Sequence, residues 1–164
     1  MDSTDDVFFV PAFTGLGSPW WDPYARGTLV GVTRGTTRAH LTRAVVEAMV
    51  FQTRDVVDAM TAGSGFEVTG LRADGGATAM DLLLQLQADQ LQVPVRRPMV
   101  QETTALGAAY LAGLAEGVWS STADIENNWA LDAEFTPRAE RSDTDKAHTR
   151  WLQALDRSRA WATS

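Results

Sequence analysis

Cysteine is absent from the 164 residues, and Lys146 is the only lysine. The first absence excludes disulfides, zinc sites with cysteine ligands and thiol catalysis. The second excludes a catalytic lysine anywhere else. No stretch approaches the roughly 18 to 20 apolar residues of a membrane span, and the N-terminal "DSTDD" lacks the basic and apolar regions of a secretion signal. We therefore expect a cytoplasmic protein with no membrane partner.

Positive charge is scarce relative to negative charge. Lysine and arginine together number 14 and aspartate and glutamate 21, which gives a net charge of -7. A field of this sign repels polyanions, so we expect no nucleic-acid partner. The hydrophobic fraction of 45% is typical of a globular core, and the length suits one domain or a large segment of one.

Hydrophobic patterning predicts strands that alternate with helices. The predicted strands cover residues 6–13, 26–33, 68–76, 91–99 and 133–137, and the predicted helices cover 36–60, 78–91, 103–119 and a last one from residue 142. This order indicates an α/β fold with at least one parallel pair of strands. Pro94 and Pro98 place the strand between them at a sheet edge. Ser142 and Asp145 resemble a capping box that opens the last helix.

The segment "RADGGATAM" (residues 72–80) leads from a strand into a helix. An Asp-Gly pair usually marks a hairpin, but the leucine-rich residues that follow have helical spacing. A strand-to-helix turn aims backbone N–H groups and the positive end of a helix at one point, and its glycines let a phosphate or a ribose approach. The segment alone favours a tight connection without a ligand. Asp74 can cap the next helix or position a metal-bound water, and a cap is the commoner role.

The other polar residues give weaker signals. Asp22 can pair with Arg26, which lies four residues later. His40 and His148 are isolated in the sequence and are expected to be solvated on helices. No pair of carboxylates has a spacing that indicates acid and base catalysis, and no serine lies in a nucleophile elbow. These residues on their own predict binding rather than bond making.

Three stretches in order resemble one family: "VPAFTGLGSPWWDPYARGTLVGVTRGTTRAHLTRAVVEAMVFQTRDVV", "ADGGATAMDLLLQLQAD" and "ETTALGAAYLAGLAEGVW". Together they resemble the C-terminal part of the glycerol kinases, within the FGGY family of carbohydrate kinases. Related sugar kinases share the "WDP.ARG" portion, whereas "PAFTGLG" points to the glycerol enzymes. The resemblance covers nearly the whole chain.

The resemblance implies a fold of the actin-like ATPase group, which is ribonuclease H-like, with an incomplete sheet and flanking helices. Residues 1–164 would form the nucleotide side of the C-terminal kinase domain, with the N-terminal sugar-binding domain absent. The first three strands of the C-terminal domain would be absent too. We therefore expect an unpaired sheet edge and an exposed apolar face.

The resemblance also implies ATP or ADP with Mg²⁺ as cofactors, and glycerol as the substrate of the intact kinase. The family's Asp-Gly-Gly loop contributes to the adenine nucleotide pocket, which makes Gly75 and Gly76, with Asp74 and Met80, the candidate nucleotide-binding residues. Met80 stands where glycerol kinases commonly carry an asparagine near the adenine, so a hydrogen-bonding side chain is missing. The family's glycerol-binding residues and catalytic base lie upstream of this segment. No catalytic residue is therefore assigned, and the chain alone is expected to be inactive.

Two other functions stay open. The chain can be a stand-alone, non-catalytic module for nucleotide binding or assembly, or a segment of another FGGY sugar kinase. Glycerol kinases are often dimers or tetramers, which makes a homo-oligomer a further expectation. Trp20 and Trp21 are expected to anchor the loop between the first two strands, either in a purely structural role or at an interface between subunits. The small residues of 103–119, including Gly107 and Ala108, are interpreted as packing positions.

Overall fold

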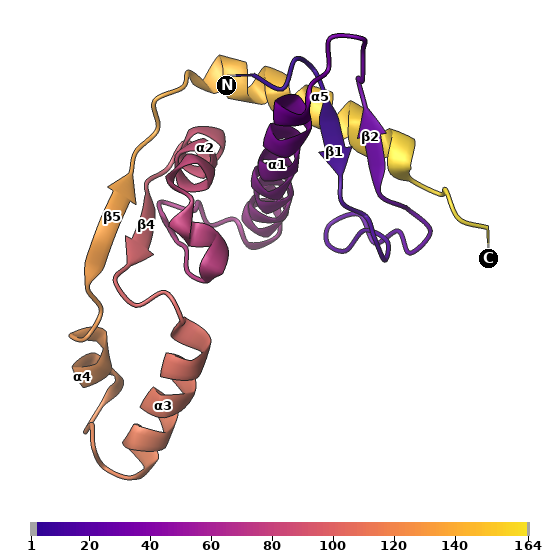
Figure 1. The fold of residues 1–164 in the computed structure, drawn as a ribbon. Coiled ribbons are helices and arrows are strands. Elements are labelled where there is room, and N and C mark those ends of the chain that lie inside the picture. Colours follow the sequence, from indigo (N-terminus) through magenta and orange to yellow (C-terminus); the bar gives the residue numbers. More distant parts are fainter. Residues whose placement is uncertain (1–2, 164) are drawn as a thin grey trace.

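The computed structural model describes residues 3–163 and contains two small sheets on either side of a long helix (Figure 1). One sheet pairs β1 (Phe8–Val10) with β2 (Thr28–Val30) in antiparallel orientation. The long helix is α1 (Arg38–Ser64), which packs against β1 on one side. It packs against α2 (Asp81–Leu91) on the other.

The second sheet has the strand order β3, β4, β5. β3 (Leu71–Arg72) runs parallel to β4 (Val95–Pro98), and α2 makes the crossover between them. β5 (Leu131–Phe135) pairs with β4 in antiparallel orientation. The predicted α/β fold with a parallel pair is confirmed. β3 has no second partner among residues 3–163, so the expected open sheet edge is present.

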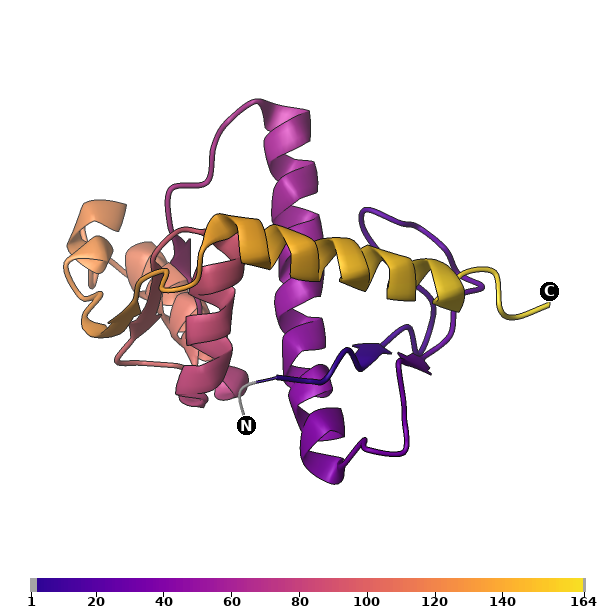
Figure 2. The ribbon, with the colours of Figure 1, turned by 90° about the horizontal axis from the view of Figure 1, so that it is seen from above.

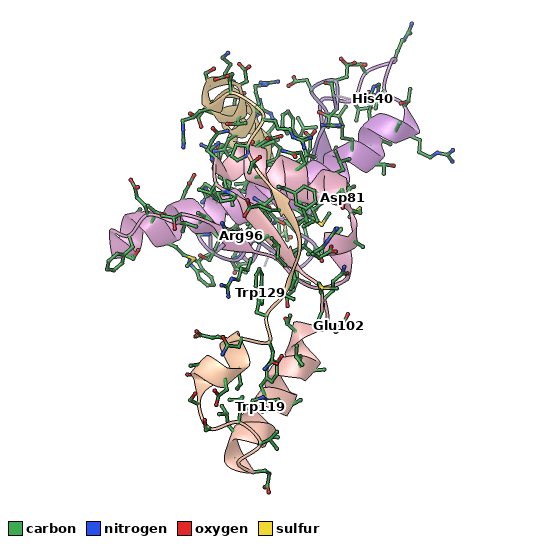
Figure 3. All side chains as sticks on the ribbon, turned by 90° about the vertical axis from the view of Figure 1, so that its left-hand side faces the viewer. His40, Asp81, Arg96, Glu102, Trp119 and Trp129 are labelled. Carbon is green, nitrogen blue, oxygen red and sulfur yellow. The ribbon has the colours of Figure 1, made fainter. Side chains whose placement is uncertain are left out.

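The remaining helices differ in how much of the core they cover. α5 (Arg141–Ser158) crosses α1 and packs on β1 and β2 (Figure 2). The 3-10 turn η1 (Gly76–Ala79) precedes α2. α3 (Thr103–Ala115) and α4 (Thr122–Glu126) extend away from the body, and we call residues 103–126 the α3–α4 arm (Figure 3). None of the helices within residues 3–163 has the length and apolarity that crossing a bilayer requires.

The largest core cluster joins the first sheet to α1 and α5. Trp151 of α5 is fully buried, and its ring stacks on Phe51 of α1 at a centroid distance of 5.3 Å. The ring centroid of Phe8 in β1 lies 6.1 Å from that of Phe51, and the two rings are tilted by 42°. Burial of such large aromatic side chains supplies much of the hydrophobic stabilisation of a domain of this size.

A buried carboxylate ties three elements together inside this cluster. Asp55 of α1 is 4% exposed and accepts hydrogen bonds from His148 Nε2 at 2.7 Å and Trp151 Nε1 at 2.9 Å. It also accepts one from Trp20 Nε1 at 3.3 Å. His148 was expected in solvent, and that prediction is wrong because its partner lies 93 residues away in the sequence.

The loop between β1 and β2 is anchored by one of its two tryptophans. Trp20 packs on the core cluster and reaches Asp55, whereas Trp21 is 74% exposed. Asp22 does not pair with Arg26 as predicted. Its carboxylate accepts from the backbone N–H groups of Ala160, Tyr24 and Ala25, and these bonds, that from Ala160 first, lower the pKa of Asp22.

Several predicted element positions need correction. β4 is the central strand rather than an edge, because Pro98 lies at a register shift where no ladder N–H is required. α5 begins at Arg141 with Glu140 as its N-cap, so the capping box at Ser142 is wrong. β3 (Leu71–Arg72) is shorter than the predicted strand at 68–76, and β5 (Leu131–Phe135) lies two residues before the predicted strand at 133–137.

The small residues of α3 do not pack as interpreted. Ala108 is exposed and Leu111 is 70% exposed, so most of this apolar helix faces solvent in the arm. Gly113 is the exception, since a Cβ there would lie 2.1 Å from Trp119. The arm therefore exposes apolar side chains, whereas the exposed apolar face expected on the sheet itself stays a prediction.

Replacing Asp55 with alanine should leave two buried donors, on His148 and Trp151, and the half-buried donor of Trp20 without an acceptor. We expect the free energy of unfolding to fall by about 3 kcal/mol. Urea denaturation followed by tryptophan fluorescence measures the change. Asp58→Ala, on the exposed side of the same helix, is the matched control and should shift stability by no more than about 0.5 kcal/mol. Equal effects of the two substitutions would contradict the role given to Asp55.

Candidate functional site

The glycine segment forms an open turn between β3 and α2. Gly75 has φ +88°, a left-handed conformation that favours glycine. Its N–H donates to the Gln101 carbonyl at 2.8 Å, which fastens the turn to the chain that leads into α3. The turn continues through η1 directly into α2. The predicted strand, glycine turn and helix are confirmed, and a hairpin is excluded.

One inward side chain closes the turn. Thr78 is 4% exposed, and both its N–H and its hydroxyl donate to the Gly75 carbonyl, at 3.0 Å and 2.7 Å. The first hydrogen bond of η1 therefore starts at Gly75. This geometry leaves the N–H groups of Gly76 and Ala77 without an acceptor inside the turn.

The outer side of the turn is bare main chain. A Cβ built on Gly75 or on Gly76 meets no atom within 4 Å among the described residues. No side chain therefore fills the space over these glycines. Two backbone donors beside an open surface at the start of a helix suit an anionic group such as a phosphate.

The other two predicted site residues lie at the two ends of this turn. Asp74 is exposed, and the positions that cap η1 and α2 are Gly75 and Met80, so its predicted role as a helix cap is wrong. Met80 joins η1 to α2, and its carbonyl accepts from the N–H of Leu83 at 3.0 Å. Its side chain is 41% exposed. The structure thus brings all four candidates together along one short segment.

Sequence reasoning missed Arg97, which binds the turn from the neighbouring strand β4. Arg97 of β4 donates from one terminal nitrogen to the Thr78 carbonyl at 2.7 Å and to Asp81 at 2.8 Å. Its Nε donates to Asp132 at 2.6 Å. The bonds to Asp132 first, and then to Asp81, raise the pKa of Arg97. The only available signal was strand alternation, which places Arg97 on the same face as Val95.

A separate cavity of about 320 Å³ lies between the α3–α4 arm and the end of β4. Tyr110 and Trp129 are among its lining residues, and the Arg72 guanidinium lies 4.6 Å from the centre of the Trp129 ring. Figure 3 shows Trp129 where the arm meets the body. None of the four predicted site residues lines this cavity. Within residues 3–163, no group of three or more metal-ligating side chains is assembled.

Comparison with known proteins decides the family. The sequence model for the C-terminal domain of the FGGY family of carbohydrate kinases matches residues 2–116. The chain belongs to the FGGY family. Glycerol kinase from Deinococcus radiodurans is 54% identical to it over 161 residues, which are 98% of this chain and 32% of that protein.

Solved structures of FGGY kinases share its fold. Plasmodium falciparum glycerol kinase, determined with ADP, superposes with a TM-score of 0.85 at 34% identity, over 96% of this chain and 32% of that one. A ligand-bound xylulose kinase from Lactobacillus acidophilus gives 0.80 at 26% identity, over 94% of this chain and 31% of that one. The predicted fold, an FGGY C-terminal domain related to actin-like ATPases, is confirmed. The chain spans about a third of the length of the curated relatives it matches.

Proposed function

We propose that these 164 residues form the nucleotide side of an ATP-dependent glycerol kinase, which transfers the γ-phosphate of ATP to glycerol and gives glycerol 3-phosphate. The observation that carries the proposal is the open turn at Gly75 and Gly76 inside an FGGY C-terminal domain. Among the superposed structures, identity is 34% to a glycerol kinase and 26% to a xylulose kinase, which favours glycerol over a sugar as the substrate.

In this proposal the turn accepts part of the nucleotide. The bare backbone at Gly75 and Gly76 lets a phosphate or ribose come close, and the N–H groups of Gly76 and Ala77 donate to it. Met80 offers an apolar contact instead of a hydrogen bond at the end of the turn. In this proposal Mg²⁺ arrives with ATP, and Asp74 is the carboxylate that directly precedes the two glycines of the turn.

Glycerol binding and removal of the hydroxyl proton are assigned to the part of the kinase that precedes this segment in its relatives. Phosphoryl transfer depends on holding the nucleophile, the metal and the phosphate in line, and one turn cannot do this alone. The open edge of β3 and the exposed apolar side chains of the α3–α4 arm, such as Leu111 and Val118, offer surface for that part to cover. A homo-oligomer stays a prediction.

A chimera tests the proposed activity. The 164 residues replace the matched part of Deinococcus radiodurans glycerol kinase, and ADP release is measured with and without glycerol. We expect glycerol-dependent turnover by the chimera and none by the 164 residues alone, because only the chimera holds both substrates. Glycerol-dependent activity of the isolated chain would contradict the assignment of glycerol binding to the part that precedes this segment. A folded chimera that shows no glycerol-dependent turnover would contradict the assignment of these residues to a glycerol kinase.

The turn is tested by Gly76→Val in the same chimera. The added side chain occupies the open space over the turn, so the Michaelis constant for ATP should rise about tenfold or more while that for glycerol stays unchanged. Gly63→Val, in the last turn of α1, is the control, because a Cβ there also meets no atom within 4 Å. An unchanged Michaelis constant for ATP in Gly76→Val would reject the assignment of the turn.

A further inference from the structure

Arg97 of β4 contacts three other structural elements at once. Its guanidinium donates hydrogen bonds to the Thr78 carbonyl in η1, to Asp81 in the first turn of α2, and to Asp132 in β5. The side chain is 12% exposed and lies 5.7 Å from the centre of the Phe135 ring. Because the guanidinium forms several charge-assisted hydrogen bonds, it holds the groups that it binds in a fixed position relative to the sheet.

The bonds from Arg97 continue to the glycine turn through one residue. Arg97 fixes the carbonyl of Thr78, and the N–H and hydroxyl of Thr78 both bind the carbonyl of Gly75. The path from Arg97 to Gly75 therefore has two consecutive steps, one hydrogen bond to Thr78 and then two parallel hydrogen bonds from Thr78 to the Gly75 carbonyl. The Gly75 N–H is held independently by Gln101.

We propose that Arg97 is a positioning residue that sets the height and tilt of the nucleotide-binding turn relative to the sheet. The inference rests on the proposed function, because it gives the turn the nucleotide as its ligand. Arg97 does not touch the nucleotide. It fixes the Thr78 carbonyl and the start of α2, so that the N–H groups of Gly76 and Ala77 point to one place before ATP arrives.

The chemistry of the site requires arginine. A planar guanidinium presents donors in fixed directions, so it serves a carbonyl and two carboxylates at once, whereas a lysine ammonium is a single point of charge. Asp81 and Asp132 balance the positive charge, and their side chains are 73% and 41% exposed. Arg97 is therefore the half-buried centre of a group whose outer members reach solvent.

Arg96 provides the contrast within the same strand. It points to the other face of the sheet and binds Glu134 at 2.5 Å, with a side chain that is 43% exposed. Figure 3 shows Arg96 and Asp81 in the body of the molecule, away from the arm. Arg96 shares the charge, the strand and a carboxylate partner on β5 with Arg97. It makes no contact with η1 or α2 in the described chain.

The test compares Arg97→Gln with Arg96→Gln in the kinase chimera. We expect Arg97→Gln to raise the Michaelis constant for ATP about tenfold, with that for glycerol unchanged, because only the nucleotide side loses its alignment. Arg96→Gln should leave both constants within about twofold. Arg97→Lys keeps the positive charge but lacks the planar set of donors, so its Michaelis constant for ATP should stay raised by about fivefold or more.

Two further measurements separate positioning from general destabilisation. Amide hydrogen exchange without nucleotide should speed up at residues 75–80 in Arg97→Gln and stay unchanged there in Arg96→Gln. Asp132→Asn weakens the hydrogen bond that holds Arg97, and it changes a more exposed residue. It should therefore raise the Michaelis constant for ATP even if Arg97→Gln folds poorly. Glu134→Gln is its control.

The outcomes separate this inference from the proposed function. A parallel rise of both Michaelis constants, or full rescue by lysine, would overturn the positioning role. Unchanged exchange at residues 75–80 in both Arg97→Gln and Asp132→Asn would overturn it as well. If Gly76→Val has no effect on ATP but exchange still speeds up in the Arg97 variant, Arg97 holds the turn and the turn is not the nucleotide site.

Discussion

The two hydrogen bonds from Thr78 to the Gly75 carbonyl fix the geometry on which the rest of this domain segment depends. They close the turn at the end of β3, which requires Gly75 in its left-handed conformation. α2 then starts at once and returns over the sheet, where Leu84 and Ala88 pack on Val95. A parallel pair needs such a crossover, so the shape of the turn and the packing of the sheet are set together.

Residues of the sheet hold the turn on one side, and the glycine backbone is open on the other. Thr78 and Arg97 are buried or nearly so, whereas Gly76 and Asp74 are exposed. Rigid support under a bare backbone surface is the arrangement that preorganised anion sites use. Asp55 plays the corresponding part in the other half of the molecule, where it joins α1, α5 and the loop that carries Trp20.

Local spacing was enough to predict much of the fold and the position of the turn. The helical periods of α1 and α2 and the Asp-Gly-Gly sequence between a strand and a helix depend on near neighbours. Contacts across the sequence were not predictable in this way. His148 meets Asp55 from 93 residues away, and Arg97 meets Thr78 from 19 residues away, with no motif that marks either pair. Pro98 misled the assignment of β4 because a register shift, which is a tertiary feature, accommodates it.

The central claim is that ADP binds against the turn at Gly75 and Gly76. Amide hydrogen exchange of the kinase chimera, compared with and without saturating ADP, tests it most directly. The account predicts that exchange slows at residues 75–80, because a bound phosphate or ribose accepts from the N–H groups of Gly76 and Ala77 and covers the glycines. Unchanged exchange in this segment, with protection by ADP only elsewhere in the chimera, would contradict it.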